Sequence, residues 1–274
     1  MLKKTVISFL FISVVSMYIN FLHGMRRAVE SLSEEGAKTV RPVDFINLQK
    51  EMPDLLISLR YRSSQNFLGR CVKGYDQAMP WLTKKAAAAL QKAANEFRDQ
   101  GFFIVLYDAF RPECAVQDFK EWAEAPEGLE SLKKLYYPLF SKPQLFEQGY
   151  IASQSSHSRG STVDITLLAI NTKERFLTGE MTEHLYRLKD GRTLTLLDDG
   201  TLLMGGHFDL FDPSSHQDTP LIDEEAKKNR TLLKNVMCKH GFQPIETEWW
   251  HFTLKEEPYP DQSFDCSLKE TSPV

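Results

Sequence analysis

Two short polar segments, residues 155–164 (SSHSRGSTVD) and 248–251 (EWWH), constrain the fold of this chain more than any other feature. Together they hold two imidazoles and two carboxylates, groups that are costly to bury without partners. Three ligands, an open position for water and a base for that water are the parts of a hydrolytic zinc site. Taken singly, the first segment also fits a serine-rich loop ending in a capping Asp, and the second fits an amphipathic strand. A fold that joins them would create a candidate active site.

The local pattern around the first segment predicts a turn followed by a strand. His157 and Asp164 lie seven positions apart, and on a straight strand an odd separation places two side chains on opposite faces. Gly160 supplies a turn that can bring them together. Apolar residues flank Asp164 in alternation, at Val163, Ile165 and Leu167. We therefore expect a half-buried strand with the Asp164 carboxylate on its polar side.

The second segment predicts a strand over residues 249–254 that is irregular at its start. Glu248 and His251 are three positions apart, so a shared face requires a turn or a bulge. Such an irregularity would hold a base and a ligand on adjacent backbone. The two tryptophans between them are expected to pack and keep both polar groups in register.

Size and charge limit the class of protein. The chain has 274 residues, enough for one large domain or two small ones. The apolar content of 42% and the charged content of 26% are ordinary for a globular protein. A net charge of -4 argues against a nucleic-acid partner.

The N-terminus indicates export. Lys3 and Lys4 precede an apolar run over residues 5–22, the pattern of a secretion signal, although no A-x-A cleavage site follows. The run is also near the lower length limit for a membrane span. We expect residues 1–24 to be a signal peptide or a membrane anchor, and residues 25–42 a linker. The protein is then exported, to the periplasm or anchored to the inner membrane, with membrane contact only through an uncleaved N-terminus.

The chain has four cysteines, Cys71, Cys114, Cys238 and Cys266. Export permits disulfides, but four thiols allow three full pairings that a sequence does not separate. Free thiols are one expectation, and a Cys238–Cys266 bond that ties the C-terminal tail to a late helix is the preferred pairing.

The elements between the two segments are marked by caps and apolar runs. Thr83 is a good N-cap for a helix over residues 84–99, which Gly101 ends. The run FFIVLY at 102–107 predicts a buried strand. Pro112 then opens a helix through residue 122. Asp108 and Arg111 therefore lie at a strand-to-helix turn, where scaffolds often present functional groups.

The later part of the chain predicts a hairpin and a helix. Turn signals at 190–191 and 199–200 bound an alternating stretch, so residues 169–200 should form a hairpin excursion. Asp223 should cap a helix that runs to about Lys239. Because strands and helices do not alternate as βαβ units would, we expect a single α+β domain over residues 43–266, followed by a polar tail at 267–274.

The combined motifs resemble the zinc D-Ala-D-Ala peptidases, and the D-alanyl-D-alanine dipeptidases of the VanX type more closely. The resemblance rests on SxHxxGxxxD at 155–164 and ExWH at 248–251, with further matches that include Asp108-Ala109-Phe110-Arg111-Pro112 and Met204-Gly205-x-x-Phe208-Asp209. It runs from about residue 43 to 265. It implies a central, mostly antiparallel sheet flanked by helices, as in the hedgehog and D-Ala-D-Ala peptidase fold.

The resemblance implies Zn²⁺ as cofactor and assigns roles at matching positions. His157, Asp164 and His251 match the zinc ligands. Glu248 matches the catalytic base, and Arg111 matches the arginine that stabilises the transition state.

Further positions match substrate contacts. Asp209 and Tyr61 are implied to bind the substrate, with Asp209 as a plausible partner for an ammonium. Ser155 and Ser156 are implied to line the site, and Asp108 to orient Arg111.

The implied reaction is zinc-dependent hydrolysis of D-Ala-D-Ala to two D-Ala, acting on dipeptide derived from the cell wall or its precursors. One alternative is a D,D-carboxypeptidase that trims longer peptidoglycan stems, and another is a zinc-containing binding module. The partner is then a small dipeptide. One departure from the family is the length of the 169–200 excursion, which could form a lid or change which peptide fits.

Overall fold

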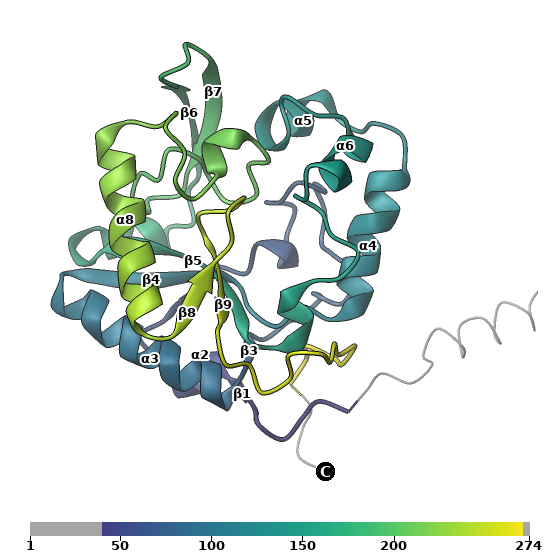
Figure 1. The fold of residues 1–274 in the computed structure, drawn as a ribbon, viewed down its shortest axis with the longest axis vertical. Helices are drawn as coiled ribbons and strands as arrows, with labels where there is room; N and C mark the ends of the chain where they lie inside the picture. Colours follow the sequence, from purple (N-terminus) through teal and green to yellow (C-terminus); the bar gives the residue numbers. More distant parts are fainter. Residues whose placement is uncertain (1–39, 271–274) are drawn as a thin grey trace, which may run out of the picture. The chain divides into compact units, whose positions relative to one another are not determined.

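The computed structural model describes residues 40–270, and its centre is a five-stranded sheet (Figure 1). Only the β2–β4 pair is parallel, and the other neighbours are antiparallel. In sheet order the strands are β2 (Leu56–Ile57), β4 (Phe102–Asp108), β5 (Thr162–Ala169), β9 (His251–Leu254) and β8 (Phe242–Pro244). The prediction of an α+β domain with a mostly antiparallel central sheet is confirmed.

Two long helices, α3 (Lys84–Asp99) and α8 (Glu224–Lys239), lie together on one side of the sheet in Figure 1. Each begins at its predicted cap: the Thr83 side chain accepts from the Ala86 N–H, and that of Asp223 accepts from the Ala226 N–H. These bonds satisfy N–H groups that have no partner within a helix. Both predicted helices are therefore confirmed, including their first residues.

Three further helices lie on the other side of Figure 1: α4 (Glu113–Glu124), α5 (Glu130–Tyr136) and α6 (Lys142–Glu147). The helix predicted after Pro112 is α4, and the run at 102–107 is the core strand β4. A register shift between Leu106 and Asp108 sets Asp108 opposite Asp164 on β5. The end of β4 thus brings a second carboxylate beside the first polar segment.

Smaller elements complete the domain. A second sheet pairs β1 (Phe45–Asn47) with β3 (Trp81–Thr83), and a third is the predicted hairpin of β6 (Thr182–Arg187) and β7 (Thr193–Asp198). Short helical segments are α2 (Leu48–Glu51), α7 (Lys173–Leu177) and the 3₁₀ turns η1 (Arg60–Arg62), η2 (Ser156–Arg159), η3 (Ile170–Thr172) and η4 (Pro213–Ser215).

Several expectations need correction. The Asp164 strand is buried on both faces, not half-buried, since Val163 and Asp164, which point to opposite faces, are both at most 1% exposed. Strand β9 begins at His251, since the two tryptophans belong to the preceding turn. Cys238 and Cys266 are not bonded to each other. The tail expected at 267–274 is not simply polar, because Leu268 is buried in the core.

The expected signal or anchor at 1–24, most of the expected linker at 25–42 and the last four residues of the tail lie outside the described part of the chain. Within residues 40–270, no helix is both long enough and apolar enough to cross a membrane.

Candidate active site

The sheet brings the two polar segments together by pairing β5 with β9. Asp164 and His251 are direct partners in that antiparallel register. The η2 turn before β5 then carries His157 over the strand end. Gly160 closes this turn with a φ of 76°, and a Cβ there would meet the Phe45 ring at 2.1 Å. Glycine is thus required both by the backbone conformation and by the lack of space.

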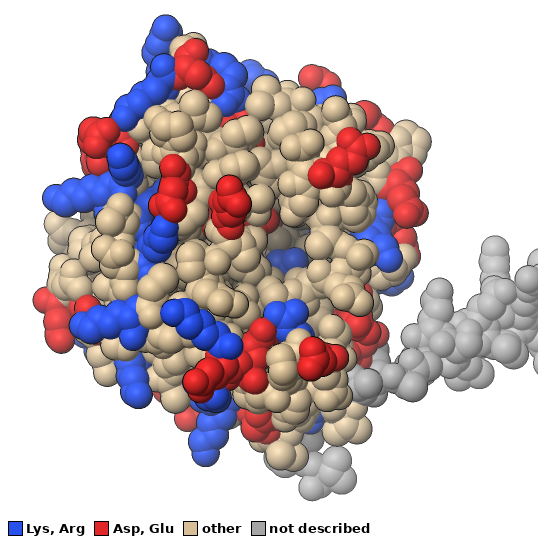
Figure 2. All heavy atoms as spheres, viewed as in Figure 1, with Lys and Arg blue, Asp and Glu red and all other residues tan. Residues whose placement is uncertain are grey.

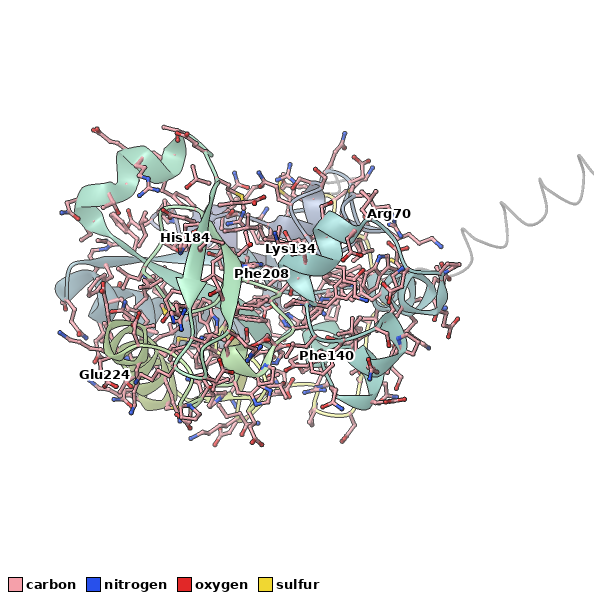
Figure 3. The ribbon with its side chains drawn as sticks, turned by 90° about the horizontal axis from the view of Figure 1, so that it is seen from above. Arg70, Lys134, Phe140, His184, Phe208 and Glu224 are labelled. Carbon is pink, nitrogen blue, oxygen red and sulfur yellow. The ribbon has the colours of Figure 1, made fainter. Side chains whose placement is uncertain are left out.

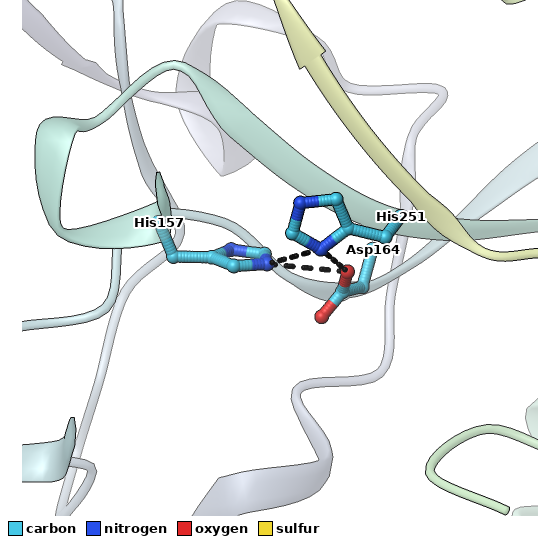
Figure 4. Close-up of side chains that lie close together, drawn as sticks. All are labelled: His157, Asp164 and His251. Atoms are coloured by element: carbon cyan, nitrogen blue, oxygen red, sulfur yellow. Dashed lines mark hydrogen bonds and ion pairs between the residues drawn. The ribbon is translucent and has the colours of Figure 1, made fainter. Parts of the chain in front are cut away.

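Three side-chain atoms from these segments form an equilateral triangle (Figure 4). His157 Nε2, His251 Nδ1 and Asp164 Oδ1 are each 3.2 Å from the other two. Tetrahedral zinc with bonds of about 2.0–2.1 Å places its ligand atoms roughly 3.3 Å apart. The spacing of the three candidate ligands therefore fits a zinc ion.

The outer nitrogens of both rings are held by neighbours. His157 Nδ1 donates to the Ala109 carbonyl at 2.7 Å, which leaves Nε2 as the free lone pair of a neutral ring. His251 Nε2 lies 3.1 Å from the Ser156 hydroxyl, and burial lowers the pKa of His251, which favours the neutral ring that binds metal. Such hydrogen bonds orient histidine ligands in metal sites. Ser156 thus contacts a candidate ligand as well as lining the pocket.

Glu248 is placed beside this triangle by the turn that precedes β9. Its Oε2 is 3.6 Å from His251 Nδ1, and its side chain is 14% exposed. Burial raises the pKa of Glu248 well above its usual value, and the nearby Asp164 and Asp209 carboxylates raise it further. A carboxylate with a raised pKa holds a proton more readily, as a general base must.

Arg111 is fixed by two carboxylates. Its Nε donates to Asp108 Oδ2 at 2.9 Å, and its Nη2 donates to Asp164 Oδ2 at 3.4 Å. Tyr75 donates to the other Asp108 oxygen at 2.6 Å. Asp108 is fully buried and does not line the pocket, so its contact with Arg111 lies outside the pocket lining. These contacts fit the orienting role that the resemblance implies for Asp108, which stays a prediction.

Asp209 lines the same pocket. Tyr61 donates to Asp209 Oδ1 at 3.2 Å, but Oδ2 has no hydrogen-bond partner within residues 40–270 although it is buried. Asp209 also has a φ of 61°, which few residues other than glycine adopt. A buried carboxylate oxygen without a donor is costly. This oxygen is therefore set up to meet a donor from a bound molecule.

These side chains enclose a cavity of about 170 Å³ that Ser155 and Ser156 also line. Figure 2 shows a hollow near the centre of one face, with basic atoms at its floor. The site residues predicted from sequence, apart from Asp108, all line this cavity. Sequence reasoning did not identify Tyr75, which holds Asp108, or Phe119, whose ring lies 5.1 Å from the Arg111 guanidinium. No local pattern marks either residue.

The charges in and behind the pocket are unbalanced. Four carboxyl groups, those of Asp108, Asp164, Asp209 and Glu248, lie near the Arg111 guanidinium, and burial raises the pKa of Asp209 and Glu248 well above its usual value. Buried charges are stable only when they are paired or bound to metal. A divalent cation in the triangle would offset two of the negative charges. The ligand chemistry and the charge balance thus both fit a bound metal ion, and together with Glu248 they define a metal-dependent hydrolase site.

Comparison with known proteins narrows this class to a family. The D-Ala-D-Ala dipeptidase family matches residues 41–180 and 188–269. A Streptomyces coelicolor protein named D-alanyl-D-alanine dipeptidase is 35% identical over 82% of this chain and 98% of its own length. Proteins with the same name from Enterococcus faecalis and Escherichia coli are 35% and 30% identical, over 98% and 93% of their lengths. The chain belongs to the D-Ala-D-Ala dipeptidase family and is a metallopeptidase.

The role of the 169–200 excursion, as a lid or in the choice of peptide, stays a prediction. None of its residues lines the catalytic cavity. The short gap in the family match, residues 181–187, falls on strand β6 of the excursion.

Proposed function

We propose that this protein hydrolyses D-Ala-D-Ala to two molecules of D-Ala with a zinc ion held by His157, Asp164 and His251. The proposal is carried by one observation: Asp209 Oδ2 is buried without a partner in the pocket that also holds the three candidate ligands. A free dipeptide has an ammonium at one end and a scissile carbonyl nearby. Asp209 supplies a site for the ammonium while the carbonyl lies toward the ligand triangle.

The protein's own residues account for the proton transfers. When bound, zinc supplies a Lewis acid that polarises the scissile carbonyl and makes water more acidic. Glu248 removes a proton from the attacking water and passes it to the departing amine. The raised pKa of Glu248, caused first by burial, makes it able to hold that proton between the two steps.

Arg111 is positioned for the charge that develops during attack. Its guanidinium keeps its charge and carries five N–H donors, of which the bonds to Asp108 and Asp164 use two. The remaining donors are available to the carbonyl oxygen as it becomes negative. Such a preorganised donor contributes about 3–4 kcal/mol to transition-state binding.

The Asp209 carboxylate also favours a substrate with a free amino end. A longer peptidoglycan stem, or an acylated dipeptide, has an amide where the free dipeptide has its ammonium. An amide has no charge to pair with Asp209, whose second oxygen would stay unsatisfied. We therefore expect the free dipeptide to be preferred over acylated forms.

The function is tested by comparing D-Ala-D-Ala, N-acetyl-D-Ala-D-Ala and L-Ala-L-Ala as substrates of the soluble domain. We expect turnover of the free D,D-dipeptide only. Preferential cleavage of the acetylated form would instead identify a carboxypeptidase, and zinc binding without any turnover would identify a binding protein.

Removal of the metal should abolish turnover and lower the Tm. A metal that binds only the folded state stabilises it, by about 4 kcal/mol when its concentration is about 1,000 times Kd. Chelator-treated protein is compared with untreated protein by activity and differential scanning calorimetry. Zinc should restore both quantities, whereas magnesium should not, because it prefers six oxygen ligands. Full turnover by protein shown to be metal-free would exclude the metal mechanism.

Asp209→Asn should weaken recognition of the ammonium while leaving the metal in place. The loss of a charged hydrogen bond, worth about 1.5–3 kcal/mol, corresponds to a KM about 10- to 100-fold higher. Asn retains the oxygen that Tyr61 contacts, so folding should change little. Asp218→Asn, at an exposed side chain that pairs with Lys234, is the matched control and should leave KM unchanged. An unchanged KM in Asp209→Asn would remove the assigned ammonium site.

We also propose that the enzyme acts after export, in the periplasm or tethered to the inner membrane, where dipeptide from the cell wall is found. The support is Lys3 and Lys4 followed by the apolar run at 5–22. Cell fractionation with antibody detection tests this proposal, and recovery of the mature protein in the cytoplasm alone would contradict it.

A further inference from the structure

A second cavity, of about 290 Å³, is lined by both strands of the β6–β7 hairpin. Small-molecule sites span roughly 300–1,000 Å³, so its ligand would be small. Much of its wall is apolar, from Met204, Phe208 and a group of leucines, Leu196, Leu197, Leu202 and Leu203. Figure 3 labels two of its lining residues, Phe208 near the centre of the domain and His184 on β6. His184 belongs to the segment that the family match leaves out.

Four side chains that line this cavity carry an N–H or O–H group without a partner in the described chain. The groups are Arg60 Nε, His207 Nε2, Trp249 Nε1 and the Tyr136 hydroxyl. All four residues are at most 9% exposed. Buried donors without partners are rare in folded proteins. Three such buried groups, on Arg60, His207 and Trp249, and the Tyr136 hydroxyl on the same cavity wall indicate that the cavity holds something that accepts hydrogen bonds.

The protonation of His207 follows from its surroundings. Its Nδ1 accepts from the Leu197 N–H at 3.3 Å, and burial lowers the pKa of His207 to about 3. The ring is therefore neutral near pH 7, and its proton is on Nε2, where it is a donor. The Tyr136 ring packs edge-on against it, with the centroids 5.3 Å apart. Two of the donors without partners thus lie on neighbouring rings.

The two carboxylates in the cavity wall already accept hydrogen bonds. Asp199 Oδ2 accepts from Arg60 and from the Tyr107 hydroxyl, and its Oδ1 accepts from the backbone and hydroxyl of Thr201. Asp198 accepts from Arg175 and from the Gly200 N–H. The wall therefore has donors without partners, whereas both of its carboxylates are already paired.

We propose that this cavity is a binding site for a small carboxylate with a short apolar tail. A carboxylate is an acceptor only, and its two oxygens offer about four lone-pair positions for the four donors. A primary amide would bring two N–H groups that this wall does not satisfy, and an ammonium would bring three. The leucines and Met204 give the tail an apolar surface.

The second cavity is distinct from the catalytic pocket. The two share no lining residue among residues 40–270. Adjacent residues of the chain line different cavities. Phe208 and Trp249 line the second cavity, whereas their neighbours Asp209 and Glu248 line the catalytic pocket. Because the catalytic pocket also contains an arginine, a test must separate carboxylate binding at the two places.

The test is isothermal titration calorimetry of the metal-loaded protein with butyrate, butyramide and butylamine. We expect butyrate to bind, butyramide to bind at least about tenfold more weakly, and butylamine not to bind. Tyr136→Phe should weaken butyrate about tenfold, since it deletes one donor. It should not disturb folding, because that hydroxyl has no protein partner. His207→Phe is a second variant with the same expected direction.

Tyr137→Phe is the matched control. It deletes a neighbouring hydroxyl that contacts Glu127 and does not line the cavity, so butyrate affinity should not change. Absence of butyrate binding would overturn the proposal, and so would equal binding of butyrate and butyramide. Binding that survives both cavity variants and disappears when the metal is chelated would also overturn it, because the carboxylate would then lie in the catalytic pocket.

Discussion

Glu248→Gln is expected to lower kcat for D-Ala-D-Ala by about 10²–10⁴-fold while the protein keeps its metal. Glutamine has nearly the same shape as glutamate but does not accept a proton at neutral pH. Glu248 is not one of the three triangle atoms, so its replacement leaves the candidate ligands in place. The expected result is thus a folded, metal-loaded protein that binds dipeptide and turns it over very slowly.

Three measurements check this result: steady-state kinetics, metal content by mass spectrometry and dipeptide binding by calorimetry. Glu246→Gln is the matched control, because it makes the same change at an exposed position two residues earlier and outside the pocket. We expect that control to retain full activity. Normal turnover by Glu248→Gln would show that another group moves the proton, and loss of metal would show that Glu248 has a ligand role.

The amino-acid sequence predicted the parts of this fold that depend on local signals. Thr83 and Asp223 are caps whose side chains act within one helical turn, so both helices begin where the sequence indicates. The 102–107 strand has a continuous apolar run, which only a buried position accommodates. The structure also places Asp164 and His251 side by side. The sequence motifs implied this pairing through family resemblance, and alternation alone did not.

Features that depend on packing between distant parts of the chain were not predicted from the sequence. Asp164 was expected on a half-buried strand, but both of its neighbours in the sheet lie far away in the chain. Tyr75 holds Asp108 through a hydrogen bond across 33 positions, and no spacing rule reaches that far. The hairpin was predicted, but the cavity beneath it was not, because the cavity needs walls from Arg60, Tyr136 and Trp249 as well. The identity of the metal and the roles of the site residues stay predictions.

The position of the Asp108 carboxylate explains why the site needs a cation at Arg111. Asp108 is fully buried and would be an uncompensated charge without Arg111. Removing one partner of a buried ion pair costs about 3–5 kcal/mol. A neutral substitution at Arg111 would therefore combine a folding defect with a catalytic one. A variant that keeps the charge separates the two effects.

Arg111→Lys is such a variant, and we expect it to lower kcat/KM by about 10²–10³-fold. Lysine keeps the positive charge but concentrates it on one nitrogen. Arg111 uses Nε for Asp108 and Nη2 for Asp164, with other donors left for substrate. A lysine ammonium drawn to the buried Asp108 would not also reach the developing negative charge. The folded state and the metal should both be retained.

Arg70→Lys is the matched control for this change. Arg70 also binds a carboxylate through two nitrogens: Nη1 and Nη2 donate to the two carboxylate oxygens of Asp118 at 2.7 and 2.8 Å. Arg70 does not line the catalytic pocket. If loss of a forked ion pair alone lowered activity, both lysine variants would lose it. We expect only Arg111→Lys to do so, with the loss mainly in kcat, because the charge on the oxygen is largest in the transition state. An increase in KM alone would instead assign Arg111 to ground-state binding of the dipeptide, through the carboxylate of the dipeptide.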